Sequence, residues 1–193
     1  MCSSDLAMLG GGSTMRSGKH REALQKAVAW LQSQQGDNGL IGKPTAQDFI
    51  YDHAIATYAL CEACGLSGKE ELRPSAQKAL DYLEAHRNPF GVWRYQPRDN
   101  DNDSSVTAWA VLALVSGKFF GFKVNEQALA MAAMWYDQVT TPDGRVGYTK
   151  QGEGSSRLAG EHGSRFPIGN GEALTAAGTF VRFVLGQDRK STR

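Results

Sequence analysis

Two kinds of helix alternate along this chain, as the spacing of its hydrophobic residues indicates. Arg21–Gln34 carries apolar residues at i, i+3, i+4 and i+7, with polar residues between them. This is the pattern of a helix with one buried side. The stripe is Leu24, Ala27, Val28 and Leu31, and it recurs as Ala76, Ala79, Leu80 and Leu83 and as Leu129, Ala132, Ala133 and Tyr136. We therefore expect three amphipathic helices, each with a side that faces water.

Three other segments are apolar on almost every side: Ala54–Cys64, Val106–Ser116 and Ala173–Leu185. A helix without a polar side is normally buried all round. Each segment ends at a glycine, the residue favoured just past a helix terminus, namely Gly65, Gly117 and Gly186. The alternation predicts an outer layer of amphipathic helices and an inner layer of apolar ones.

A second pattern repeats after each outer helix. The first copy is Lys26-Ala27, Trp30-Leu31, Gln35, Gly39 and Ile41; the second is Lys78-Ala79, Tyr82-Leu83, Arg87, Gly91 and Trp93; the third is Met131-Ala132, Trp135-Tyr136, Thr140, Gly144 and Val146. The three glycines are 52 and 53 residues apart. A fixed period of about this length indicates stacked supersecondary units.

This repeat resembles the QW motif of the terpenoid cyclase and prenyltransferase repeat superfamily, which includes squalene–hopene-type cyclases. Lys78–Trp93 matches the motif except for Arg87 at the glutamine position, and the other two copies depart from it further. Phrases such as Tyr51-Asp52-His53-Ala54 and Trp93-Arg94-Tyr95 look closest to a bacterial branch. The resemblance implies an all-α fold, specifically part of an α/α toroid of helical hairpins. It also implies that the motif glutamine caps an inner helix. Because the motif tryptophan packs against the neighbouring turn in that family, we predict that Trp30, Trp93 and Trp135 belong to the core.

The resemblance spans one repeat domain, residues 7–187, which we expect to be partial because a complete toroid has about twice as many hairpins. Residues 1–6 fit no repeat and are interpreted as a non-native start, and 188–193 form a polar tail. The end units of a partial toroid expose apolar faces. The remaining repeats of a larger parent protein, or self-association, are therefore expected to cover them. The role of the long, glycine-rich connection 142–171 stays open.

Composition limits the kinds of partner that we expect for this chain. The 193 residues carry a formal net charge of +1, which gives no reason to expect a nucleic acid partner. The apolar runs are shorter than the roughly 20 residues that span a bilayer. Three cysteines do not make a disulfide framework, and Cys61 and Cys64 are interpreted as helix packing residues. The compartment cannot be inferred from these features.

Candidate chemistry centres on the entry to the second inner helix. Squalene–hopene-type cyclases protonate an alkene with an aspartic acid in the motif DxDDTA, and Asn100–Val106 occupies the corresponding place. If Asp103 takes the last position of the acid motif, Asn102 replaces the proton donor; if Asp103 is the donor, Ser104 replaces its partner. Neither register restores the motif. The alternative is that Asp103 or Ser104 caps the helix.

Metal and cofactor chemistry find little support. Protein prenyltransferases hold zinc with Asp, Cys and His, and Asp52-His53 occupies such a place, but the Asp-x-Cys pair is missing and His162 is unplaced. We therefore predict neither a metal site nor a cofactor.

Two functions remain. The incomplete acid motif favours a non-catalytic binding or interaction module, whose ligand is an apolar lipid, an isoprenoid or a peptide. The alternative is a fragment of an active isoprenoid cyclase, an isomerase of the terpene cyclase/mutase type. Asp103 and Asp101 are the catalytic candidates, and the binding candidates cluster at predicted inner-helix entries: Tyr51, Asp52, His53, Arg94, Tyr95 and Glu172.

Overall fold

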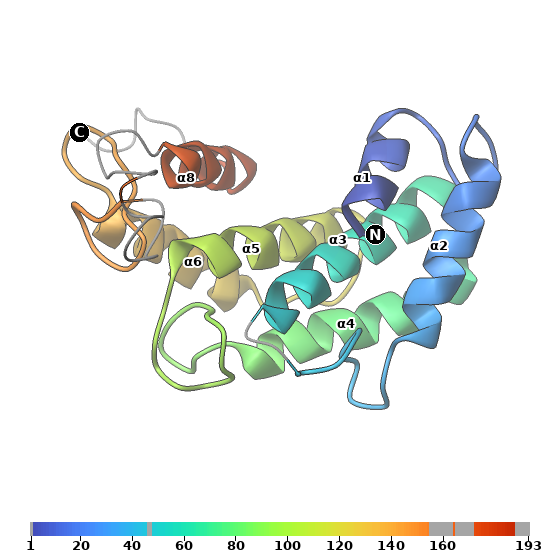
Figure 1. Ribbon diagram of the computed structural model, residues 1–193, viewed down its shortest axis with the longest axis horizontal. Coiled ribbons are helices and arrows are strands. Elements are labelled where there is room, and N and C mark those ends of the chain that lie inside the picture. The colour runs from blue at the N-terminus through green and yellow to red at the C-terminus, as the bar shows by residue number, and fades with distance from the viewer. Residues whose placement is uncertain (1, 46–47, 155–163, 165–171, 188–193) are drawn as a thin grey trace. The chain divides into compact units, whose positions relative to one another are not determined.

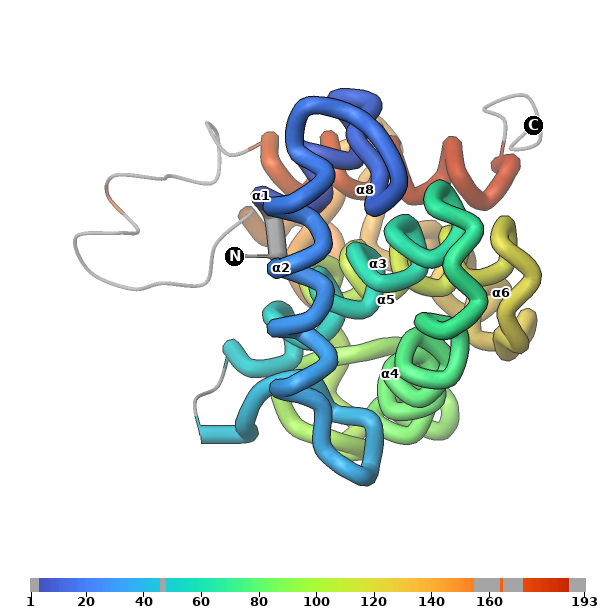
Figure 2. The backbone as a smooth tube through the Cα atoms, turned by 90° about the vertical axis from the view of Figure 1, so that its right-hand side faces the viewer, coloured from blue at the N-terminus to red at the C-terminus, as the bar shows by residue number. Residues whose placement is uncertain are grey.

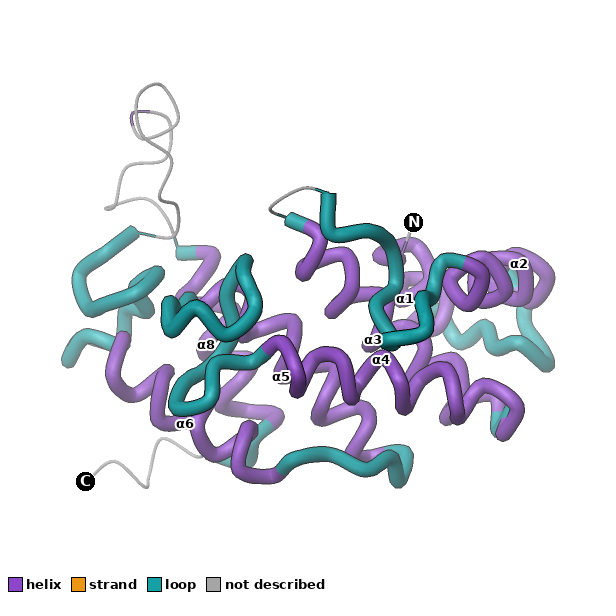
Figure 3. The backbone as a smooth tube through the Cα atoms, turned by 90° about the horizontal axis from the view of Figure 1, so that it is seen from below, coloured by secondary structure: helices purple, strands orange, loops and turns teal. Residues whose placement is uncertain are grey.

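The computed structural model describes residues 2–45, 48–154, 164 and 172–187, and within these ranges its regular elements are helices (Figures 1 and 3). They are α1 (Cys2–Gly10), α2 (Arg21–Ser33), α3 (Phe49–Ser67), a short 3₁₀ helix (Glu70–Leu72), α4 (Arg73–His86), α5 (Ser104–Phe119), α6 (Glu126–Val139) and α8 (Ala173–Val184). The predicted all-α class is confirmed. None of these helices is both long enough and apolar enough to cross a membrane.

The chain divides into two compact units, one of residues 1–86 with 112–125 and the other of 87–111 with 126–193. In the first unit α3 packs against both α1 and α4 (Figure 2). Because neighbours cover it on several sides, the whole predicted inner segment Ala54–Cys64 is buried or half-buried. α3 extends beyond this predicted segment at both ends, and the added residues Phe49 and Ile50 are also buried.

Two predicted helix ends are wrong. Gly65 and Gly117 lie inside α3 and α5, which continue for two residues beyond each of them. A Cβ at Gly65 would lie 2.1 Å from the ring of Phe120, and one at Gly117 would lie 2.8 Å from Leu80. Both glycines therefore permit close packing rather than ending a helix. Gly186 does follow the end of α8, with the positive φ of 72° that suits glycine.

In the second unit α6 packs against α8. The prediction that Ala173–Leu185 is buried nearly all round is wrong, because only Leu174, Gly178 and Val181 of α8 are buried. Phe180 and Phe183 are exposed on the same helix. Burial of an apolar helix depends on its neighbours, and no helix follows α8 within the described ranges to cover its other side.

The predicted core position of Trp93 and Trp135 is confirmed, but that of Trp30 is wrong. Trp135 donates its indole N–H to Ser104 Oγ, at 3.2 Å, 31 residues earlier in the chain. The side chain of Trp30, by contrast, is 41 % exposed.

The connections after α2, α4 and α6 share one set of backbone hydrogen bonds. The turn 36–39 is closed by Gly39 N to Gly36 O at 2.9 Å, and Gly36 N donates to Leu40 O. The same pair of bonds closes 88–91 and 141–144. The three connections are thus one structural element, repeated at the sequence period.

Each connection is also hydrogen-bonded to the inner helix that follows. The backbone N–H two residues after the turn glycine donates to a side chain of that helix: Ile41 to His53 Nδ1 at 3.1 Å, Trp93 to Thr107 Oγ1 at 3.3 Å and Val146 to Thr175 Oγ1 at 3.1 Å. This hydrogen bond to a side chain near the start of the following helix is therefore common to all three connections.

The residue at the motif glutamine position stabilises the turn. Gln35 Nε2 donates to Gly39 O at 3.1 Å and to Ser75 O on α4. The implied cap on an inner helix is not found, because Ser75 belongs to an outer helix. Arg87 makes the corresponding bond to Gly91 O, at 3.0 Å. Arginine replaces glutamine here without loss of this turn contact.

Candidate functional site

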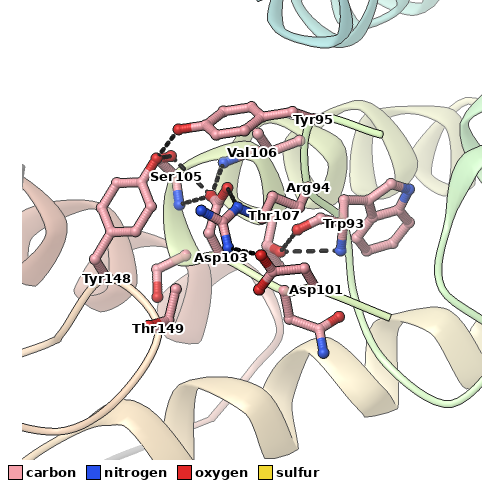
Figure 4. A network of polar contacts seen from close by, with 12 residues as sticks. Trp93, Arg94, Tyr95, Asp101, Asp103, Ser105, Val106, Thr107, Tyr148 and Thr149 are labelled. Atoms are coloured by element: carbon pink, nitrogen blue, oxygen red, sulfur yellow. Dashed lines mark hydrogen bonds and ion pairs between the residues drawn. The ribbon is translucent and has the colours of Figure 1, made fainter. Parts of the chain in front are cut away.

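The start of α5 gathers the densest polar network of the predicted site residues, and all of it lies in the second unit (Figure 4). Asp103 has no solvent-exposed surface. Its Oδ1 accepts hydrogen bonds of 2.8 Å from Ser105 N, Ser105 Oγ and Val106 N. These are the contacts of a helix N-cap, so the structure assigns the capping role to Asp103.

The second oxygen of Asp103 faces Arg94. Oδ2 accepts no hydrogen bond in the described part of the chain and lies 3.7 Å from Arg94 Nε. Arg94 also forms an ion pair with Asp101 and lies over the ring of Tyr95, 5.2 Å from its centroid. Asp101, Asp103, Arg94 and Tyr95, all predicted site residues, are thus brought together.

Burial and hydrogen bonding act on Asp103 in opposite directions. Burial raises the pKa of this carboxyl, and the N–H groups of Val106 and Ser105 and the charge of Arg94 lower it by less. The net result is a pKa above the ordinary aspartate value. A raised pKa is the property that an acid catalyst needs.

A chain of hydroxyl groups joins the network to the third connection. Tyr95 and Tyr148 share a hydrogen bond between their hydroxyls, and Tyr148 Oη lies 3.2 Å from Ser105 Oγ. Tyr148 is not among the site residues predicted from the sequence. It follows Val146 by two positions as Tyr95 follows Trp93, and the 53 residues between the tyrosines equal the repeat period. The repeat spacing is therefore the sequence signal that identifies Tyr148 as a counterpart of Tyr95.

Ser104 ties the same helix start to α6 and to the third connection. Its N–H donates to Tyr148 O at 2.9 Å and its hydroxyl to Gly147 O at 2.8 Å. Its own carbonyl accepts the hydroxyl of Tyr136 at 2.6 Å. In the register that would make Ser104 the partner of a proton donor, its polar groups therefore have structural roles. In the other register, Asn102 Oδ1 accepts Val92 N and is likewise engaged.

The remaining predicted site residues lie elsewhere. Tyr51, Asp52 and His53 belong to the first unit, in the first turns of α3. Glu172 precedes α8, and its carboxylate pairs with Arg145. The predicted site residues therefore lie at or beside the starts of three different helices and do not form one cluster.

His53 has a structural role. Its Nδ1 accepts Ile41 N–H, which leaves Nε2 to donate to Ala79 O at 3.1 Å. Burial lowers the pKa of His53 to about 3, against the opposing effect of the Ala79 hydrogen bond. Within the described residues no group of three or more His, Cys, Asp or Glu side chains could hold a metal ion. His162, the unplaced zinc candidate, lies outside those residues.

The chemistry open to the network at the start of α5 depends on whether a substrate can reach Asp103. Asp103 Oδ2 has no surface that a molecule the size of water could touch, whereas a general acid must come within hydrogen-bond reach of its substrate. Comparison with family models, curated proteins and solved structures gives no match for this chain.

Proposed function

We propose that this chain is a non-catalytic interaction module of the terpenoid cyclase and prenyltransferase repeat type, and that it forms part of an α/α toroid. Three connections with the same hydrogen bonds, at the period of the QW-like pattern, support the repeat assignment. Outer helices with one buried side beside the buried α3 support the two-layer hairpin arrangement.

One observation carries the non-catalytic assignment. The carboxyl group in the place of the cyclase acid is a helix cap paired with Arg94, and it has no accessible surface. Alkene protonation requires the acid to contact the substrate directly. A closed capping site is suited to holding α5 in position and not to that reaction.

A second function has its own supporting observation. The raised pKa of Asp103 favours an acid of an isoprenoid cyclase, the alternative function. In that case Arg94 would have to move away from Oδ2 to admit the substrate.

We expect the ligand of the module to bind its apolar surface. Exposed phenylalanines on α8 suit an apolar lipid, an isoprenoid, a peptide or further hairpins of the same type. Self-association and attachment to the remaining repeats of a parent chain both follow from such an open face.

Incubation with squalene tests the assignment. Purified protein in detergent micelles is incubated with squalene and with shorter isoprenoids, and the extracts are analysed by gas chromatography and mass spectrometry. We expect no cyclised product from the wild type and none from Asp103→Asn, which keeps a capping oxygen. A cyclic product made by the wild type and lost in Asp103→Asn would establish catalysis and refute the proposal.

A further inference from the structure

The side chains of Asp101, Arg94 and Asp103 are graded in their exposure to solvent (Figure 4). Asp101 is 57 % exposed, Arg94 is 11 % exposed and Asp103 has no exposed surface. Arg94 forms an ion pair with both carboxylates, and its Nε lies 3.7 Å from Asp103 Oδ2. This gradient indicates that the guanidinium covers Asp103 on the side nearest the solvent.

Asp101 is held in place by its backbone. The buried Asn88 donates through Nδ2 to Asp101 O at 2.6 Å and accepts the N–H of Asn100 through Oδ1 at 3.0 Å. Asp101 N also donates to Asp99 Oδ1, at 3.0 Å. The carboxylate of Asp101 can therefore hold Arg94 against Asp103 without being buried itself.

The two oxygens of Asp103 have separate roles. Oδ1 accepts the N–H groups of Ser105 and Val106 and so caps α5, whereas Oδ2 faces Arg94. The cap does not depend on the guanidinium. Movement of Arg94 would uncover Oδ2 and leave the start of α5 in place.

We propose that Arg94 is a gate over Asp103 and that Asp101 holds this gate closed. An ion pair with an exposed carboxylate contributes little to stability and is screened by salt, so the guanidinium can exchange Asp101 for solvent. In the closed state Asp103 is a helix cap alone. In the open state its second oxygen is accessible to a molecule in solution. The gate controls access to the carboxyl whether or not the chain is catalytic, so it goes beyond the proposed function.

Carbodiimide labelling measures this access. A water-soluble carbodiimide adds to a carboxyl oxygen that it can reach, and glycine ethyl ester then displaces the urea and leaves an amide that peptide mass spectrometry locates. Wild-type protein is compared with Arg94→Ala, Asp101→Asn and the control Arg98→Ala at one pH. Arg98 is an exposed arginine of the same connection.

Two other carboxyl groups serve as references. The exposed Asp99 gives the labelling rate of an open site in the same connection. Asp5 is buried in the first unit, so its labelling reports unfolding of the protein and not movement of the gate. Should Arg94→Ala unfold, Asp101→Asn decides the test, because the side chain that it changes is exposed.

We expect Asp103 of the wild type to be labelled at least about tenfold more slowly than Asp99, since a closed site reacts only when it opens. Arg94→Ala and Asp101→Asn should both accelerate labelling of Asp103 and leave Asp5 protected, and Arg98→Ala should match the wild type. Wild-type Asp103 labelled as fast as Asp99, unchanged labelling in Arg94→Ala or Asp101→Asn, or an equal gain in Arg98→Ala would overturn the proposal. A cyclic product from squalene would refute the non-catalytic assignment and leave this result unaffected.

Discussion

At the scale of single residues, the polar side chains at inner-helix starts are engaged in local structure. Asp103 caps α5, and His53 joins the first connection to α3 and α4. A cap at Asp103 or Ser104 could be predicted from the sequence, because an acidic or hydroxyl residue before an apolar run is a helix-start signal. Its pairing with Arg94 could not, because that contact depends on how the connection folds back.

His53 should make stability depend on pH. Its folded pKa of about 3 lies below the ordinary value of 6.5. Between these two pKa values the unfolded chain binds a proton at His53 and the folded chain does not. The contribution of neutral His53 to the free energy of unfolding is therefore complete above pH 6.5 and is lost as pH falls toward 3. One pKa unit corresponds to about 1.4 kcal/mol, which gives a loss of about 2 kcal/mol at pH 5.

The control is His53→Gln, whose amide can still donate to Ala79 O and does not titrate. Urea unfolding at pH 7 and pH 5 should show a drop about 2 kcal/mol larger for the wild type than for this variant. Equal drops in the two proteins would show that His53 is not the group responsible.

At the scale of elements, several glycines are explained by other parts of the chain that pack closely against them. Gly65 and Gly117 lie against Phe120 and Leu80 inside helices. Because a glycine after an apolar run also marks a helix end, the sequence predicts helix ends at these two positions, and that prediction is wrong. The difference lies in a distant side chain that local sequence does not reveal.

The turn glycines allow a matched comparison. Gly39 has a φ of 92°, and a Cβ there would lie 2.2 Å from Lys78 O on α4. Gly144, at the same place in the third connection, has a φ of 91° and open space around it. Alanine at either position costs about 1–2 kcal/mol for the left-handed backbone, but only Gly39→Ala also meets the carbonyl.

We expect Gly39→Ala to be destabilised by at least about 2 kcal/mol more than Gly144→Ala, because a backbone clash forces the turn away from α4. Urea unfolding midpoints with a common slope measure the difference. Similar midpoints for the two variants would mean that the first turn does not pack on α4 as described.

At the scale of the whole molecule, the alternation of helix types and the repeat could be predicted from the sequence, because hydrophobic spacing reports which sides of a helix are buried. α3 agrees with this expectation. α8 and Trp30 do not, because burial also depends on what packs against a helix, which local spacing does not report: α8 has three buried residues, and Trp30 is 41 % exposed.

The account depends on a hydrogen bond that recurs in all three connections, from the backbone N–H two residues after the turn glycine to a side chain of the next helix. Residue-resolved amide hydrogen exchange, followed by nuclear magnetic resonance, measures this directly. The amides of Ile41, Trp93 and Val146, which donate to His53, Thr107 and Thr175, should exchange far more slowly than exposed turn amides, although all three lie outside helices. Exchange of these three amides at the rate of an unfolded peptide would contradict the account.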